Sequence, residues 1–364
     1  MNLLKKILKE LRLLIEINES SRTWHAPLLT AVCVGVPLLS GWHYNQLTYG
    51  LMACLGGLVI LYLPFSGAVT NRISTILICS FGFLISFTIG QFFSFSKTAA
   101  VISLGLFSIV VHWIILYYKA NAPGSLFFIL IAALSVCQPH NLTSVPFKVG
   151  LIALGTMFSA FIALTYTLMI SARVLRNKEN IVVPLLSKNQ LADFWEAIIL
   201  GGFMAITLAI GFIMEIQYPY WITISCAAVM QGASLYNIWQ RTFQRIFGTF
   251  IGLGLCWLFL SFVETHLMIC LFIIALIMIV EMLIVRNYAL AVIFITPLAI
   301  LLSEASTPEM GNPTELISLR FYEIVIGSFL GAIGGWVLHK EKIRYATIKG
   351  LRKINVGLKK QVTP

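Results

Sequence analysis

Residues 266–285 read HLMICLFIIALIMIVEMLIV, a stretch in which Glu281 is the one acidic or basic side chain apart from His266. A run of about 20 mostly apolar residues is long enough for a helix to cross the hydrocarbon core of a bilayer. Similar runs recur along the chain, separated by polar or Pro/Gly breaks. They lie near 25–41, 46–64, 73–93, 98–118, 122–138, 148–170, 193–214, 218–238, 245–263, 266–285, 288–303 and 317–338. The sequence therefore predicts an all-α integral membrane protein with about twelve transmembrane helices.

The composition of the whole chain supports the same class. Of its 364 residues, 59% are hydrophobic and 11% are charged, whereas about 25% of the residues of a typical soluble domain are charged. The runs leave room for short loops, one linker and two tails, but not for a separate soluble domain. The predicted organisation is an amphipathic basic segment (1–24), a first six-helix half (25–170), a linker (171–192), a second half (193–338) and a basic tail (339–364).

The distribution of positive charge predicts the orientation. With both termini in the cytoplasm, all but three of the 25 Lys and Arg residues fall on the cytoplasmic side, as the positive-inside rule requires. The three exceptions are Lys97, Lys148 and Arg320. The net charge of +11 is then a topological signal combined with a tail suited to anionic lipid headgroups. It indicates membrane lipids, and not nucleic acid, as partners.

The two halves also align with each other at an offset of about 173 residues. The aligned pairs include Arg72 with Arg245, Lys148 with Arg320, and Gly155 with Gly327. Because each half has an even number of spans, both copies point the same way. The sequence therefore predicts two parallel six-helix repeats, related by a pseudo-two-fold axis along the membrane normal, with a natural cavity between them.

Three stretches in the second half carry a recognisable motif. Residues 218–223 read YPYWIT and residues 240–252 read QRTFQRIFGTFIG, and residues 320–327 read RFYEIVIG. This pattern resembles the fusaric acid resistance family, which includes the aromatic acid exporters. The resemblance implies efflux of small, often aromatic, carboxylates across the inner membrane, in several members beside a periplasmic adaptor protein. Many relatives carry a large cytoplasmic domain, whereas this chain has a short linker, so a role of that domain is not expected here.

Five residues are candidates for substrate binding. Arg72 and Arg245 are predicted at the cytoplasmic ends of the third and ninth helices, and Arg320 at the outer end of the twelfth. An arginine can hold a carboxylate through two hydrogen bonds. Trp221 could stack on an aromatic substrate, and Thr249 belongs to the Arg245 motif. The alternative for the cations is an ordinary anchor at a helix end, and for the aromatic ring a place in the interfacial belt.

Three further residues are candidates for proton coupling. Glu281 and Glu323 interrupt predicted spans, and an ionised carboxylate in the hydrocarbon region must pair, face a wet cavity or carry a proton. Glu323 has a cation three residues earlier, Arg320, so a local ion pair is its alternative role. His112 could relay protons or serve only in packing. At the predicted offset its counterpart lies near Val285, which would make that site asymmetric.

These observations predict a secondary transporter that exports small organic anions. A passive organic-anion channel and a major-facilitator-like transporter are the alternatives, although the 67–74 loop lacks the aspartate and trailing cations of the facilitator motif. An enzyme is not expected, because Asp193 is the only aspartate and no catalytic cluster stands out. Dispersed Cys and His residues predict no metal or other cofactor. An adaptor protein and a homo-oligomer both stay open as partners.

Overall fold

The computed structural model describes residues 23–65, 67–120, 123–174, 190–232, 234–262, 265–304 and 313–340. Within these ranges the chain is helical and contains no strand. The helices of the first part are α2 (His25–His43), α3 (Leu47–Gly57) continued by the 3-10 helix η1 (Leu58–Tyr62), α4 (Val69–Phe92), α5 (Lys97–Tyr117), α6 (Leu126–Val136), η2 (Leu142–Ser144) and α7 (Val145–Val174). The second part contains α8 (Gln190–Ile213), α9 (Tyr220–Met230), α10 (Leu235–Phe262), α11 (His266–Leu283), α12 (Tyr288–Glu304) and α13 (Pro313–His339).

Eight of these helices are long and apolar enough to cross a membrane, and four shorter apolar segments accompany them in the described ranges. Large hydrophobic side chains stand exposed on the outer faces of the long helices, for example Ile78, Phe81 and Leu106. A water-soluble surface would not carry so many, whereas lipid tails solvate them. The prediction of an all-α, multi-pass membrane protein is therefore confirmed.

The order of long and short helices is the same in the two parts of the chain. From α2 to α7 the order is long, short, long, long, short, long, and from α8 to α13 it recurs. An 11-residue helix such as α6 or α9 rises about 16 Å, roughly half the thickness of the hydrocarbon core. A helix of this length that lay along the membrane normal would end inside the hydrocarbon core, where surrounding helices must cover its free backbone groups.

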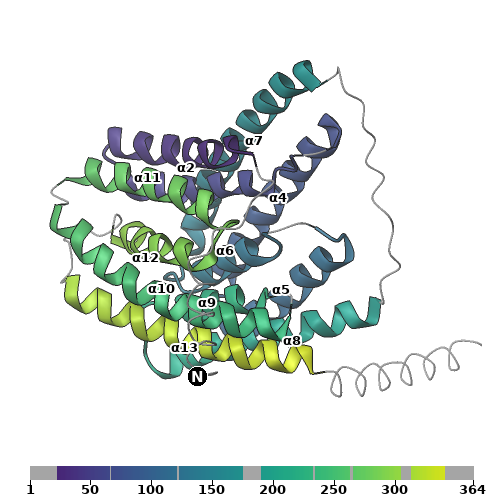
Figure 1. Cartoon of the computed structure of the whole chain (residues 1–364), viewed down its shortest axis with the longest axis vertical. Coiled ribbons are helices and arrows are strands. Elements are labelled where there is room, and N and C mark those ends of the chain that lie inside the picture. Colours follow the sequence, from purple (N-terminus) through teal and green to yellow (C-terminus); the bar gives the residue numbers. More distant parts are fainter. Residues whose placement is uncertain are drawn as a thin grey trace, which may run out of the picture.

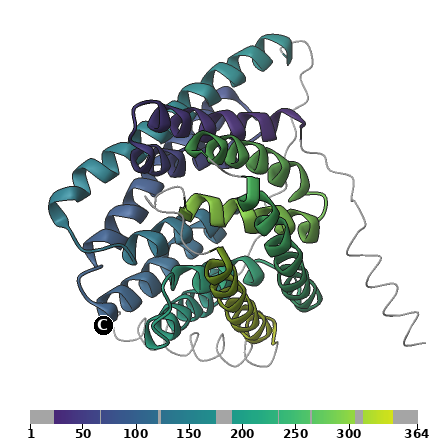
Figure 2. The ribbon, with the colours of Figure 1, turned by 90° about the vertical axis from the view of Figure 1, so that its left-hand side faces the viewer.

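The helix pairs also correspond between the two parts (Figures 1 and 2). The second and sixth helices pack together in each part, as α3 with α7 and α9 with α13, and so do the third and fifth, as α4 with α6 and α10 with α12. The fourth helix of each part lies against the first helix of the other. In Figure 1, α11 runs beside α2 and α5 runs towards α8.

The buried core follows from these pairings. One hydrophobic cluster joins α4, α5, α6 and α7 around Phe83, Phe87 and Ile131. A second cluster joins α2 and α3 to α11 and α12 around Leu38, Ile273 and Leu301. The second cluster therefore ties helices from the two ends of the sequence into one body.

Two predicted spans have different bounds in the structure. The predicted span 218–238 ends earlier, because α9 stops at Met230 and the chain turns at Gln231 and Gly232. The predicted span 245–263 begins ten residues earlier, because α10 starts at Leu235. The first turns of α10 are amphipathic, with Ile238 buried and the polar Asn237 half-buried. A hydropathy window misses them, since their polar residues lower the average over the window.

The predicted N-terminal segment, most of the linker and nearly all of the basic tail lie outside the described residues. Of the linker, α7 reaches Val174 and α8 starts at Gln190.

Candidate functional site

A buried ion pair and an indole ring meet where α9 and α13 pack together. The guanidinium carbon of Arg320 lies 3.4 Å from the centre of the Trp221 ring. Arg320 Nη1 donates to Glu323 Oε2 over 3.3 Å, one turn along α13. Arg320 is 4% exposed and Glu323 is fully buried. The ring face and the carboxylate offset part of the cost of burying this cation.

Arg245 of α10 reaches the same region from the other side. Its Nη1 donates to the hydroxyl of Tyr288 at 3.0 Å, and its Nη2 donates to Ser225 Oγ at 3.2 Å. Ser225 lies one turn beyond Trp221 on α9. The charge of Arg245 is near enough to act on Arg320. The two arginines therefore form one cluster with Trp221 and Glu323, which we call the arginine cluster (Trp221, Ser225, Arg245, Tyr288, Arg320, Glu323).

Some hydrogen-bond donors and acceptors inside this cluster are unpaired among the described residues. Arg245 Nε, Arg320 Nη2 and Glu323 Oε1 are buried, and in the described part of the protein none of the three atoms has a hydrogen-bond partner. The side-chain groups to which Arg245 donates, the hydroxyls of Tyr288 and Ser225, are neutral. Two guanidinium groups and one carboxylate leave an excess of positive charge in a buried place, which is costly unless an anion or water compensates it.

Glycines bring the helices that carry the cluster close together. A Cβ added at Gly327 of α13 would overlap the carbonyl oxygen of Ile222 on α9, and one at Gly331 would come within 2.9 Å of the carbonyl oxygen of Cys226. On α10, a Cβ at Gly252 would lie 2.8 Å from Thr296 Cβ of α12. Gly248 and Gly252, one turn apart on α10, thus allow α12 to approach closely.

Thr249, the fifth predicted binding residue, lies one turn after Arg245 on α10 and is fully buried. Its hydroxyl oxygen has no hydrogen-bond partner among the described residues. The structure thus gathers Trp221, Arg245 and Arg320 directly, and adds Thr249 on the helix turn beside them.

The sequence predicts Arg72 and Arg245 at cytoplasmic helix ends and Arg320 at an outer helix end. The structure groups these three cations differently. Arg72 lies in the first turn of α4, where Nη2 donates to the carbonyl oxygen of Phe65 at 2.8 Å. Arg245 is ten residues inside α10, because that helix starts earlier than predicted. Arg245 therefore lies with Arg320 in the arginine cluster and does not share the helix-end position of Arg72.

His112 and Glu281 lie at the two contacts between the parts of the chain. His112 of α5 contacts Ser125 Oγ through Nδ1 at 2.8 Å, and its Nε2 is 3.8 Å from Glu196 Oε1 of α8. Glu281 is buried near the end of α11, the helix that packs against α2. Of the three predicted proton-coupling residues, Glu323 belongs to the arginine cluster.

Ser225 and Tyr288 are members of the cluster that the sequence did not single out. Ser225 sits within an apolar run, and Tyr288 is the first residue of α12.

The fit of a metal can also be tested: in the described part of the chain no three His, Cys, Asp or Glu side chains gather closely enough to hold one. The polar chemistry of this site is that of hydrogen-bond donors and positive charge.

Comparison with known proteins agrees with the motif in this half. Residues 204–334 match the model of a family described as fusaric acid resistance protein-like. A relative from Bacillus subtilis, described as an uncharacterized membrane protein named YvaC, is 39% identical over 131 residues, which make up 36% of this chain and 20% of that relative. The aligned part thus spans about a fifth of the relative's length. No solved structure matches. The matched range is less than half of this chain and contains the whole arginine cluster, so it is residues 204–334 that resemble the fusaric acid resistance protein-like family.

Proposed function

We propose that this protein is a secondary transporter that exports small organic anions, with aromatic carboxylic acids as the leading substrate class. The observation that carries the proposal is Arg245, a buried cation that donates hydrogen bonds to the hydroxyl groups of Tyr288 and Ser225. A buried charge without a countercharge is costly. An incoming carboxylate would supply that countercharge.

The arginine cluster suits a carboxylate on chemical grounds. The buried donors Arg245 Nε and Arg320 Nη2 have no hydrogen-bond partner within the described residues, and a carboxylate has two oxygen atoms with which to accept from guanidinium groups. Trp221 and Tyr220, whose ring centres are 5.2 Å apart, would provide contact surface for an aromatic ring. Thr249 adds a hydroxyl donor one turn along α10.

The short helices support a site at this place in the fold. In transporters built from repeats, interrupted helices in corresponding positions of the two halves mark the substrate site. Here α3 corresponds to α9, and α6 to α12, by their order and their packing partners. Gly155 of α7 meets the carbonyl oxygen of Ala53 of α3 in the way that Gly327 meets that of Ile222. We therefore propose two parallel six-helix repeats, as the sequence predicts.

The direction of transport follows from orientation and charge. With both termini in the cytoplasm and the protein in the inner membrane, each anionic charge that leaves the cell gains roughly 2.3 kcal/mol per 100 mV. Proton coupling would use Glu323, which lies in the cluster, with Glu281 and His112 at the contacts between the halves. A periplasmic adaptor protein or a second copy of this chain as partner stays a prediction.

The test is resistance to toxic aromatic acids in a strain that lacks the gene. Arg245→Ala and Arg320→Met should reduce resistance to the level of the deletion strain, because the carboxylate loses a charged hydrogen-bond donor. Arg286→Ala is the matched control, since it removes an exposed cation at the turn between α11 and α12, and it should retain resistance. Membrane abundance is measured by immunoblot for every variant. Full resistance in Arg245→Ala at normal abundance would contradict the proposal.

Flux in proteoliposomes then separates transport from passive conduction. A secondary transporter that uses Glu323 for protons requires a proton gradient for accumulation of benzoate against its concentration gradient. Continuous benzoate current without that gradient would instead identify a channel.

A further inference from the structure

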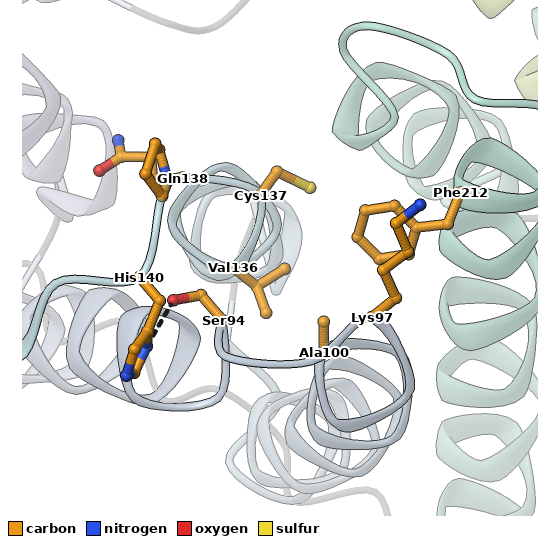
Figure 3. Close-up of a pocket in the computed structure, with 9 residues that line it drawn as sticks. Ser94, Lys97, Ala100, Val136, Cys137, Gln138, His140 and Phe212 are labelled. Carbon is orange, nitrogen blue, oxygen red and sulfur yellow. Dashed lines mark hydrogen bonds between the residues drawn. The ribbon is translucent and has the colours of Figure 1, made fainter.

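A second polar pocket lies outside the arginine cluster, at the end of the bundle where α4 ends and α5 begins (Figure 3). Its volume is about 250 Å³, and its lining comes from the α4–α5 turn, the start of α5, the end of α6 and α8. Pockets for drug-sized ligands measure roughly 300–1,000 Å³. This one therefore suits a smaller molecule.

The polar part of the pocket is positively charged. Lys97 and His140 line it, and no carboxylate does. Ser94 Oγ lies 3.1 Å from His140 Nδ1, a contact that Figure 3 shows as a dashed line. Cys137 adds a thiol to the lining.

A second layer of side chains adds a further cation behind the lining. Lys148 Nζ donates to Gln138 Oε1 at 3.1 Å and to Gln91 Oε1 at 3.3 Å. Gln91 is fully buried, and its Nε2 donates to Ser94 Oγ at 3.0 Å and to the carbonyl oxygen of Pro139 at 3.1 Å. This network holds Gln138 and Ser94 at the pocket wall. Lys97, Lys148 and Arg320 are also the three cations that the charge distribution leaves on the outer side.

The rest of the lining is apolar. Val136 and Ala100 form part of the wall, and in Figure 3 the Lys97 side chain extends towards the Phe212 ring. A positively charged group beside an aromatic face and an aliphatic wall matches a ligand with a carboxylate at one end and an apolar body at the other.

The pocket adjoins the arginine cluster through one residue. The Cys137 thiol contacts the backbone of Tyr220. The Tyr220 side chain in turn interacts with Arg320 and Glu323, and its ring packs against that of Trp221. Tyr220 therefore lies between a pocket that opens at the end of the bundle and the buried charges of the cluster.

We propose that this pocket is a second binding site for small carboxylates, an outer vestibule through which the exported anion passes after the arginine cluster. The carboxylate lies beside Lys97 and His140, and an aromatic body packs against Phe212. The place of the pocket in the export path rests on the proposed function, whereas anion binding in the pocket does not.

The experiment measures how benzoate protects a thiol placed in the pocket of the purified protein. Ser94→Cys puts a reactive thiol on the lining, and Phe95→Cys puts one on the exposed neighbour outside it. At a benzoate concentration about four times the Kd, maleimide labelling of the Ser94→Cys variant should slow about fivefold, because only the unoccupied fifth of molecules reacts. Labelling of the Phe95→Cys variant should not change. The wild-type protein, in which six cysteines are buried and Cys137 is half-buried, supplies the background rate.

Second substitutions in the Ser94→Cys protein test which lining residues bind the carboxylate and which bind the apolar body of the ligand. Lys97→Met should abolish protection, and Lys119→Met, an exposed lysine beyond the other end of α5, should leave it intact. Phe212→Leu should weaken protection by benzoate more than protection by acetate. Inorganic phosphate at equal ionic strength should protect poorly, since it has no apolar body. Protection by phosphate that equals protection by benzoate would overturn the carboxylate assignment in favour of a phosphate or phospholipid headgroup.

The outcome separates this inference from the proposed function. Arg320→Met in the Ser94→Cys protein should retain protection although export is lost. Absence of protection in a protein whose export still depends on Arg320 overturns the vestibule and leaves the exporter standing. If protection depends on Lys97 while export does not depend on Arg320, the anion site in the pocket is supported and the proposed role of the arginine cluster in export is contradicted.

Discussion

At the scale of single residues, the chemistry of the second half depends on how Arg320 is held. Its guanidinium group is planar and weakly hydrated compared with an ammonium group, so it can lie flat on the Trp221 ring while it donates to Glu323. A lysine at this position could not do both with the same geometry. Glu323 therefore balances one of two buried positive charges, which in the proposed transporter leaves Arg245 to bind the substrate.

The first prediction concerns this ion pair. Glu323→Gln should lower the thermal stability of the detergent-solubilised protein strongly, because breaking a buried pair from one side costs about 3–5 kcal/mol. The double variant Arg320→Met/Glu323→Gln should be more stable than Glu323→Gln alone, since no uncompensated charge is left. The measurement is the apparent unfolding temperature in the same detergent for all variants. Losses that simply add in the double variant would show that the two groups do not depend on each other.

At the scale of helices, the sequence predicted which segments are apolar better than where each helix starts. All twelve predicted runs overlap an apolar helical segment of the structure, because hydrophobic length is a local property. The start of α10 at Leu235 was not predictable from hydropathy, since its first turns are amphipathic. The position of this boundary determines where Arg245 lies. Because α10 starts at Leu235, Arg245 is in the helix interior and not at the helix end.

The residues of the site were predicted in part, because some of them stand out in the local sequence and others do not. Arg245, Arg320, Glu323 and Trp221 stood out as polar or aromatic residues in motifs, and the structure brings them together. Ser225 and Tyr288 carry no such signal, because their role comes from the packing of α9 and α12 on α10. Local patterns do not report which helices pack on which.

The second prediction belongs to the contact between α9 and α13. Gly327→Ala should reduce resistance and lower the unfolding temperature, because the added methyl group overlaps the Ile222 carbonyl oxygen and pushes Arg320 away from Trp221. Gly254→Ala on α10 is the matched control, as nothing lies within 4 Å of a Cβ there. In that helix interior alanine is favoured over glycine by up to about 1 kcal/mol. Gly254→Ala should therefore keep resistance and stability. A loss of equal size in both variants would contradict the packing argument.

At the scale of the whole molecule, the two halves correspond in packing but differ in chemistry. In the predicted alignment of the halves, Arg320 pairs with Lys148, which donates hydrogen bonds to two glutamine side chains and not to a carboxylate. The counterpart of Trp221 and Ser225, judged by the helix that Gly155 meets, is an apolar part of α3 around Ala53 and Gly56. The charged site thus belongs to the half that matches the family model. In the proposed transporter, the first half would act mainly as the body against which the second half moves.

The last prediction tests that movement through the contacts between the halves. Gly105→Cys/Ala205→Cys joins α5 to α8, where a Cβ added at Gly105 lies 2.9 Å from Ala205 Cβ. Gly90→Cys/Ser135→Cys joins α4 to α6 within one half, where the corresponding separation is 2.8 Å. Both pairs need a small shift to reach the Cβ separation of about 3.5–4.5 Å that a disulfide requires, and a Cβ at Gly90 also lies 2.6 Å from the carbonyl oxygen of Ala132. Both are made in a protein whose seven native cysteines are replaced by alanine.

If export requires the halves to rock about a central axis, oxidation of the α5–α8 pair should stop benzoate export in proteoliposomes, and a reductant should restore it. Oxidation of the α4–α6 pair should leave export unchanged, because both helices move with the same half. The extent of cross-linking is read from mass spectrometry of the oxidised and reduced proteins. Benzoate flux that persists through a fully formed α5–α8 disulfide would mean that the halves need not move, and a fixed conduction path beside the arginine cluster would then replace alternating access.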